Sequence, residues 1–175
     1  MFVAVVIVII IAVIIGLAAS RPGAFRVVRS ILVHASAGEA FGLINDFHLW
    51  DQWSPWEKMD SGMKKSFSGA LAGAGSVYEW EGNNKVGKGR MEILNTVPNA
   101  RIVIKLDFLK PLEAHNTAEF LLSAEGDGTR VTWAMFGPQP FMAKLMGLFM
   151  NMDKMIGKDF ERCLAQLKGV AERQG

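Results

Sequence analysis

The chain has 175 residues, 50% of them hydrophobic, and a formal net charge of +2. This length allows one domain with a well-formed core plus an additional segment. The near-neutral charge, with no basic block or stripe, excludes a typical nucleic-acid-binding surface, so we expect no nucleic acid partner. The single cysteine, Cys163, excludes an internal disulfide and a multi-cysteine metal site, and its apolar neighbours indicate a buried, inert thiol.

The N-terminal segment is apolar without interruption. Residues 2–19 read FVAVVIVIIIAVIIGLAA, and a helix of this length would extend roughly 27 Å, close to the hydrocarbon core of a bilayer. We therefore predict a transmembrane anchor at 1–20 and a separate domain at 21–175. A cleaved signal peptide is the alternative, because the small residues at 18–20 resemble a cleavage site, although no basic region precedes the apolar run.

Charges that follow the apolar segment predict its orientation. Arg21, Arg26 and Arg29 come after it, and the first acidic residue is Glu39. Positive residues beside a membrane span favour the cytoplasmic side. We expect a single-pass membrane protein that contacts the membrane through residues 2–19, with its domain on the cytoplasmic side.

The domain begins with a predicted strand at 25–34, in which β-branched and apolar residues alternate with polar ones. Ser36 and Glu39 then form a capping box, which predicts a helix that ends near Asn45-Asp46. The next stretch, WDQWSPW at 50–56, contains three of the five tryptophans.

The spacing of these three tryptophans predicts a tight turn. Trp50, Trp53 and Trp56 are three residues apart, so they would eclipse one another in a 3₁₀ turn. Pro55 disfavours the α conformation at the residue before it. Three interpretations stay open: packing that holds the turn, the wall of a pocket, or contact with a membrane interface, where tryptophan is enriched.

From residue 64 onward the pattern indicates short strands separated by turns, which is typical of an antiparallel sheet. Alternation gives this sheet one apolar face, rich in aromatic residues, and one polar face of mixed charge. The expected strands are 65–68, 76–81, 86–96, 101–108, 116–124 and 129–136.

Two helices are expected at the C-terminal end, a short one at 141–149 and a long one at 152–173. Apolar residues recur at steps of three and four along the long helix, which predicts one apolar face. This face would cover the apolar face of the sheet. Its members are Met152, Met155, Ile156, Phe160, Cys163, Leu164 and Leu167.

The sequence has no recognisable catalytic constellation. His34, His48 and His115 have no metal-ligand spacing, so we expect no metal and no cofactor. Asp107, Glu119 or His115 could act in catalysis only if a bulge turned them toward the apolar face. The hydroxyl of Tyr78 and the indole N–H groups of Trp80 and Trp133 would supply the few polar contacts of an apolar pocket.

Several motifs together resemble the START-like superfamily (SRPBCC, polyketide cyclase/dehydrase-like). These are the tryptophan stretch, GSVYEWEGN at 75–83, VGKGRM at 86–91 and MDKMIGKDFE at 152–161, in the order strand, short helices, strands, long helix. The resemblance implies an α+β helix-grip fold, in which a curved antiparallel sheet of about seven strands wraps a long C-terminal helix. It implies no function by itself, because the superfamily includes lipid carriers, binders, cyclases and co-chaperones.

We expect a binding protein that holds a hydrophobic small molecule or lipid in a cavity between the sheet and the last helix. A cyclase/dehydratase-type enzyme and a protein-interaction module without a ligand remain alternatives. The candidate lining residues are Trp53, Trp56, Tyr78, Trp80, Met91, Phe108, Phe120, Trp133, Met135, Met152, Met155, Ile156 and Phe160.

Overall fold

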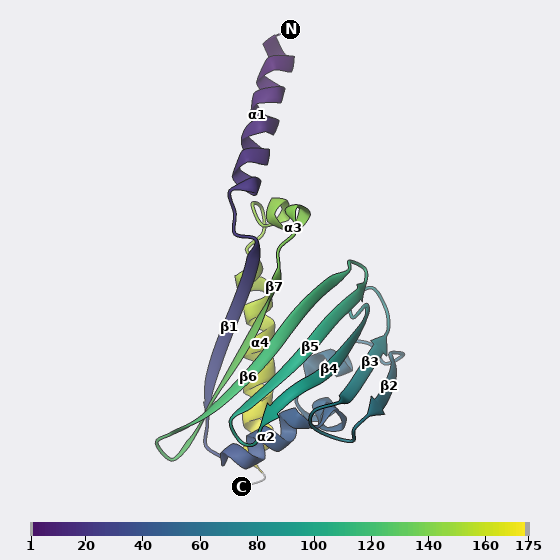
Figure 1. The fold of residues 1–175 in the computed structure, drawn as a ribbon, viewed down its shortest axis with the longest axis vertical. Helices are drawn as coiled ribbons and strands as arrows, with labels where there is room; N and C mark the ends of the chain where they lie inside the picture. The colour runs from purple at the N-terminus through teal and green to yellow at the C-terminus, as the bar shows by residue number, and fades with distance from the viewer. Residues whose placement is uncertain (1, 174–175) are drawn as a thin grey trace.

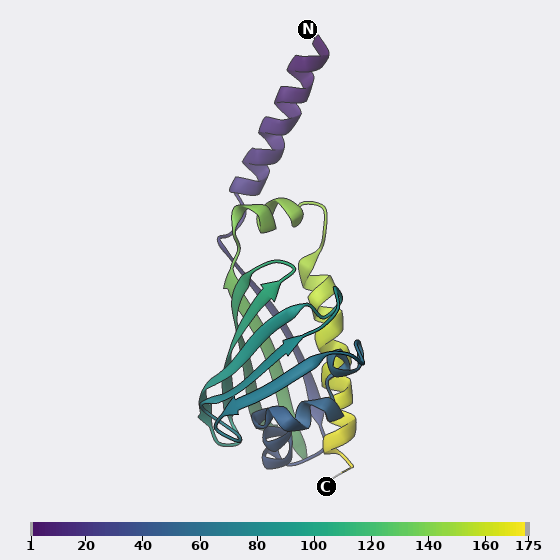
Figure 2. The ribbon, with the colours of Figure 1, turned by 90° about the vertical axis from the view of Figure 1, so that its right-hand side faces the viewer.

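A computed structural model describes residues 2–173, in which a curved antiparallel sheet wraps one side of a long helix (Figures 1 and 2). The helices are α1 (Phe2–Ala19), α2 (Ala37–Asn45), α3 (Phe141–Met146) and α4 (Met152–Ala171), and two 3₁₀ turns, η1 (Phe47–Gln52) and η2 (Pro55–Lys58), follow α2. The strands are β1 (Ala24–Val33), β2 (Lys64–Gly69), β3 (Ser76–Glu81), β4 (Lys88–Val97), β5 (Arg101–Lys110), β6 (Ala114–Glu125) and β7 (Gly128–Pro138).

The seven strands lie in the order β1-β7-β6-β5-β4-β3-β2, and every neighbouring pair is antiparallel. All strands but the first therefore follow one another as a meander, and β1 forms one edge of the sheet beside β7. This arrangement confirms the predicted helix-grip fold. The strand and helix bounds differ from the expected ones by a few residues, which is the usual uncertainty at element ends.

Helix α1 extends away from the domain, with almost all of its side chains exposed (Figure 1). It has a mean hydropathy of 3.4 over 18 residues, so by length and composition alone it could cross a membrane. Only Ala18, near its C-terminal end, is buried, and there α1 packs against α3.

The predicted capping box starts α2. The Ser36 hydroxyl oxygen accepts a hydrogen bond from the Glu39 backbone N–H at 3.2 Å, and the Glu39 carboxylate accepts one from the Ser36 N–H at 2.8 Å. These two bonds satisfy backbone donors that have no partner within the helix.

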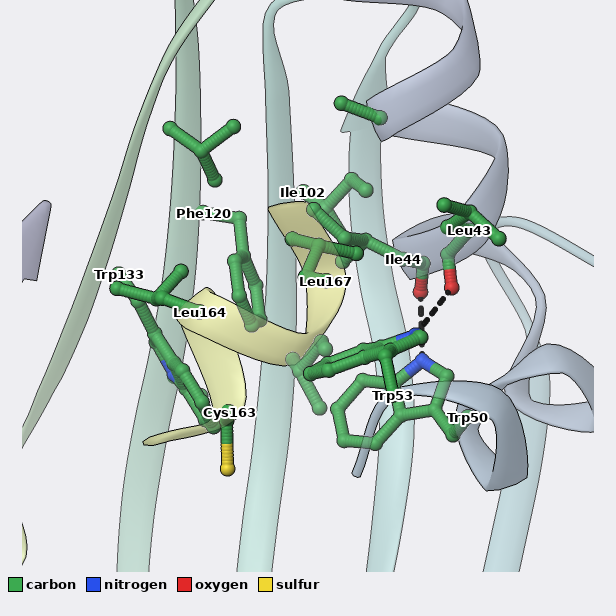
Figure 3. Packing of buried hydrophobic residues seen from close by; sticks show 14 of the residues in the cluster. Leu43, Ile44, Trp50, Trp53, Ile102, Phe120, Trp133, Cys163, Leu164 and Leu167 are labelled. Carbon is green, nitrogen blue, oxygen red and sulfur yellow. Dashed lines mark hydrogen bonds between the residues drawn. The ribbon is translucent and has the colours of Figure 1, made fainter. Parts of the chain in front are cut away.

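Two tryptophans satisfy backbone acceptors at the other end of α2. The indole N–H of Trp50 donates to the Ile44 carbonyl at 2.9 Å, and that of Trp53 donates to the Leu43 carbonyl at 3.0 Å (Figure 3). The last carbonyls of a helix lack partners within it, so the two indoles serve as a C-terminal cap. This geometry favours the packing interpretation for Trp50 and Trp53, which are bound to α2 at the end of the domain far from α1 (Figure 1).

Arg29 of β1 joins the sheet to α4. Its side chain points toward the helix, where it donates to the carboxylates of Glu161 at 2.8 Å and Asp153 at 3.0 Å. Gly157 lies between these two acids, one helical turn from each. An added Cβ at Gly157 would overlap the Arg29 guanidinium, so the glycine provides the space that lets the arginine lie across the helix.

The indole cap generates a test of stability. Replacing Trp53 with Phe keeps most of the apolar contact but leaves the buried Leu43 carbonyl without its donor, which should lower the free energy of unfolding by about 1–3 kcal/mol. Trp56→Phe is the matched control, because Trp56 is half-buried. Urea denaturation of the full chain in mild detergent measures both. Equal losses in the two variants would contradict the capping role.

The space at Gly157 generates a second test. A glycine-to-alanine change inside a helix ordinarily raises stability by about 1 kcal/mol. Here the added methyl displaces Arg29 from its two acids, so we expect Gly157→Ala to lower the Tm of the wild-type chain. In an Arg29→Ala background the same change should instead raise the Tm. A thermal double-mutant cycle measures this reversal, and an equal effect in both backgrounds would contradict the described contact.

Candidate functional site

The concave face of the sheet and the facing side of α4 share a set of aromatic side chains, here called the inner aromatic surface. Alternation along the strands places the strand members there, since every second residue of a strand points to the same face. Trp53 and Trp56 come from the tryptophan turn, and Phe160 comes from α4. The surface comprises Trp53, Trp56, Tyr78, Trp80, Phe108, Phe120, Trp133 and Phe160.

Trp133 lies at the centre of this surface. Its ring stacks on Phe160 of α4 with the centroids 3.9 Å apart and an interplanar angle of 4°. It also stacks on Phe120 of β6 at 4.8 Å, and the rings of Trp53 and Trp56 meet it edge-on at 6.3 and 6.0 Å. One indole thus contacts the neighbouring strand β6, the helix α4 and the tryptophan turn.

Two of the three expected polar groups of the surface have partners within the protein. The Tyr78 hydroxyl donates to the Glu57 carboxylate at 2.8 Å, and Glu57 also pairs with Lys65. Burial raises the pKa of Tyr78, and the bond to Glu57 adds to that effect. The Trp80 N–H donates to the Val86 carbonyl at 2.9 Å. These groups therefore hold the sheet edge and the adjacent loops together.

The third polar group, the indole N–H of Trp133, has no hydrogen-bond partner although the atom is buried. Within residues 2–173 the Asn45 side-chain oxygen is the one other buried side-chain atom in this state. A buried unpaired donor is costly, by about 1–3 kcal/mol. The N–H of Trp133 is therefore a buried donor without a partner, and Arg29 of β1 is the cross-strand neighbour of this tryptophan.

The expected lining residues fall into two groups by burial. Seven are buried: Trp53, Tyr78, Met91, Phe120, Trp133, Met135 and Phe160. Five are half-buried: Trp56, Trp80, Phe108, Met152 and Ile156. Phe108 and Trp80 lie near the ends of β5 and β3, and Met152 and Ile156 in the first turns of α4, so these four belong to the end of the domain nearer α3 (Figure 1), whereas Trp56 lies in η2.

Met155 differs from the other lining candidates. It is 47% exposed, and with Lys154 and Lys158 it borders an open depression on the outer face of α4. A second shallow depression lies farther along the same helix face, beside Arg162 and Ala165. The sequence pattern placed Met155 on the apolar face because it stands three residues after Met152, but the helix turns it outward, away from the inner aromatic surface.

Two polar residues of the inner face were not expected from the sequence. Arg29 stands in phase with the apolar residues of β1, and that phase is the signal that could have revealed its inward direction. Asn116 of β6 is 8% exposed and lies against Gly137 of β7, where an added Cβ would overlap its side chain.

The acidic and histidine candidates for catalysis lie on the outer face. Asp107 and His115 are cross-strand neighbours joined by a 2.8 Å hydrogen bond, and Lys105 pairs with the same carboxylate at 3.0 Å. Glu119 pairs with Arg101 at 2.7 Å and lies 4.0 Å from Arg26. The bulges between β4 and β5 do not turn Asp107 inward. Over the residues described, no cluster of three metal-ligating side chains forms.

A curved antiparallel sheet around a C-terminal helix, with an apolar inner surface, defines a helix-grip domain. Residues 24–172 match the model of the family described as "Polyketide cyclase / dehydrase and lipid transport". The chain belongs to this family. No curated protein matches it.

Solved structures share the fold at low sequence identity. Protein CV1439 from Chromobacterium violaceum is 16% identical, with a TM-score of 0.59 over 87% of this chain and 99% of that one. The Aha1 dimer from Colwellia psychrerythraea is 12% identical, with a TM-score of 0.60 over 85% and 96%. The di-domain ARO/CYC StfQ from the steffimycin biosynthetic pathway is 11% identical, with a TM-score of 0.63 over 86% and 51%. At these identities the likeness shows the fold alone.

The outer-face pair generates a prediction of pH dependence. The hydrogen bond to Asp107, with a second to Glu113, raises the pKa of His115. The stabilisation of the folded protein by the charged His115 is therefore complete below the unfolded-state pKa of about 6.5, and it is lost as the pH rises through the higher folded-state pKa. We expect Tm to fall across this range in the wild type and less in His115→Gln. Asp107→Asn should flatten the profile in the same way, and unchanged profiles in both variants would contradict this coupling.

Proposed function

We propose that this protein binds a hydrophobic small molecule or lipid on the inner aromatic surface, without catalysing a reaction on it. In this proposal residues 1–20 tether the chain to a membrane and residues 21–175 form the binding domain, on the cytoplasmic side. The family's description, which names both cyclase/dehydrase activity and lipid transport, is compatible with such a role.

The unpartnered N–H of Trp133 is the observation that carries this proposal. A core that served packing alone would gain stability from an apolar ring there, because the free donor loses its bonds to water on burial. A ligand with a carbonyl, ester or hydroxyl oxygen would supply the missing acceptor, while the surrounding rings would contact its apolar part. Apolar pockets with few polar groups are the usual form of small-molecule sites.

The burial pattern supports a direction of entry. Side chains of the protein fill the centre of the inner aromatic surface around Trp133 and Phe160. The half-buried Trp80, Phe108, Met152 and Ile156 leave apolar area accessible toward the end near α3. A ligand would bind at this end first and displace neighbouring side chains. Methionines such as Met91 and Met135 can re-pack at low cost, because their side chains are unbranched and flexible.

The positions of the titratable candidates favour binding over the cyclase alternative. General acid–base catalysis needs a proton-transferring group within hydrogen-bond reach of the substrate. Asp107, Glu119 and His115 are paired on the outer face of the sheet, on the opposite side from the inner aromatic surface. A ligand held beside Trp133 would be out of their reach.

Two matched aromatic probes test the proposal: 2-acetylnaphthalene, which has a carbonyl acceptor, and 2-ethylnaphthalene, which has the same shape without one. The full chain in nanodiscs is compared as wild type and as Trp133→Phe, which retains an aromatic ring but has no N–H. We expect the Kd of the ketone to rise about threefold to tenfold, the value of one neutral hydrogen bond, while that of the hydrocarbon stays the same.

Partitioning of the probes into the nanodisc lipid is identical for both variants, so it cancels in this comparison. Failure of either probe to bind the wild type above empty nanodiscs would overturn the proposed function. Equal binding of the ketone by both variants would show that Trp133 is not the polar contact.

A further inference from the structure

The segment at 141–150, FMAKLMGLFM, exposes apolar side chains that a water-facing segment would ordinarily bury. Phe149 is 75% exposed and Met142 is 65% exposed. Phe141, Met146 and Met150 are each more than 40% exposed. Its one charged residue is Lys144, and none of its residues belongs to the hydrophobic core cluster of the domain. The segment, which includes α3, therefore exposes five large apolar side chains within ten residues.

This segment lies directly beside the end of α1 (Figures 1 and 2). Helices α1 and α3 pack together, and Ala18 is fully buried at that end of α1. The Gln139 N–H donates to the Gly23 carbonyl at 2.8 Å, which joins the start of the segment to the connection after α1. The exposed apolar side chains of the segment therefore lie beside the end of the apolar helix.

The charges near the segment suit an anionic surface. Arg21 follows the last turn of α1, and its guanidinium lies against Gly147, 3.3 Å from where a Cβ would stand. Lys144 projects from α3, and the sequence has no acidic residue between Pro138 and Asp153. Apolar side chains flanked by basic ones are typical of segments that lie in the interfacial layer of a bilayer.

We propose that residues 141–150 form a second membrane contact, which lies in the headgroup region of an anionic bilayer with Phe149 and Met142 inserted among the acyl chains. This inference rests on the membrane tether of the proposed function and adds an interaction surface to it. Two contacts, the tether and this segment, would fix the orientation of the domain, whereas the tether alone would leave it free to rotate.

The second contact also orients the entrance of the inner aromatic surface. Two half-buried residues of that surface, Trp80 and Phe108, belong to the end of the domain nearer α3 (Figure 1). The β5–β6 turn at the same end exposes Leu112, which is 67% exposed. With residues 141–150 on the bilayer, this end would face the lipid, and an apolar ligand could pass between membrane and protein over a short path.

Site-directed labelling of the full chain in vesicles tests this contact. Cys163 is fully buried, and burial raises the pKa of its thiol to about 12, so a newly introduced cysteine is the reactive one. Phe149→Cys and Met142→Cys are labelled with an environment-sensitive fluorophore in vesicles of phosphatidylcholine and phosphatidylglycerol. Nitroxide-bearing lipids quench a probe that lies in the bilayer, and iodide quenches one in water.

The matched control is Leu71→Cys, because Leu71 is 84% exposed in the β2–β3 loop. This loop lies beside the end of α2, far from α1, since the Gly73 N–H donates to the carbonyl of Asn45, the last residue of α2. Val8→Cys in α1 reports on the tether itself. We expect nitroxide lipids to quench the probes at 142, 149 and 8 several-fold more than the probe at 71, and a lower phosphatidylglycerol content to reduce quenching at 142 and 149.

Quenching at position 8 without quenching at 142 and 149 would overturn the second contact while leaving the tether in place. Iodide quenching at all four positions would overturn the second contact and the tether together. Ligand binding does not enter these measurements, so a failure of the naphthalene probes to bind would not be mistaken for either outcome.

Discussion

Phe160 of α4 stacks on Trp133 of β7 with the rings almost parallel, and this contact joins the two layers of the domain. A curved sheet with one apolar face is stable only when that face is covered, because apolar area left in water costs about 25 cal/mol per Å². Helix α4 supplies the cover, and Arg29 fixes its rotation by binding Asp153 and Glu161 across Gly157. The aromatic stack is one part of this cover, beside the buried Cys163, Leu164 and Leu167, while the arginine determines which side of the helix faces the sheet.

The same side chains serve as core and as candidate site, which places opposing demands on them. Packing for stability favours a filled interior, whereas binding requires that some of it can be displaced. The two requirements fall on different residues. Trp53, Phe120 and Phe160 are fully buried and fill the interior, while Trp80 and Phe108 are half-buried and remain accessible to a ligand. Stability is concentrated toward α2 and the tryptophan turn, and adaptability toward α3.

The sequence predicted the fold well because its local signals agreed with one another. The capping box at Ser36 and Glu39, the strand alternation and the helical apolar periodicity all depend on neighbouring residues, and the structure has each of them. Contacts between distant residues were less accessible. The indole bonds to Leu43 and Ile44 depend on how the chain turns after α2. The acidic partners of Arg29 lie more than 120 residues away, although its inward phase could be read from β1. The outward position of Met155 depends on the rotation of α4. A free N–H on Trp133 is a property of three-dimensional packing that no local pattern contains.

The tryptophan turn has a spectroscopic consequence. Trp50 contacts Trp53 at 4.7 Å, Trp53 contacts Trp133, and Trp133 contacts Trp56, so four of the five indoles form one connected chain of rings. Excitation energy transfers readily over such separations, and emission from this group therefore reports on its lowest-energy member. The intrinsic fluorescence of the protein thus reports on the contact between the sheet and α4, and a change in that contact would alter the emission of all four connected tryptophans.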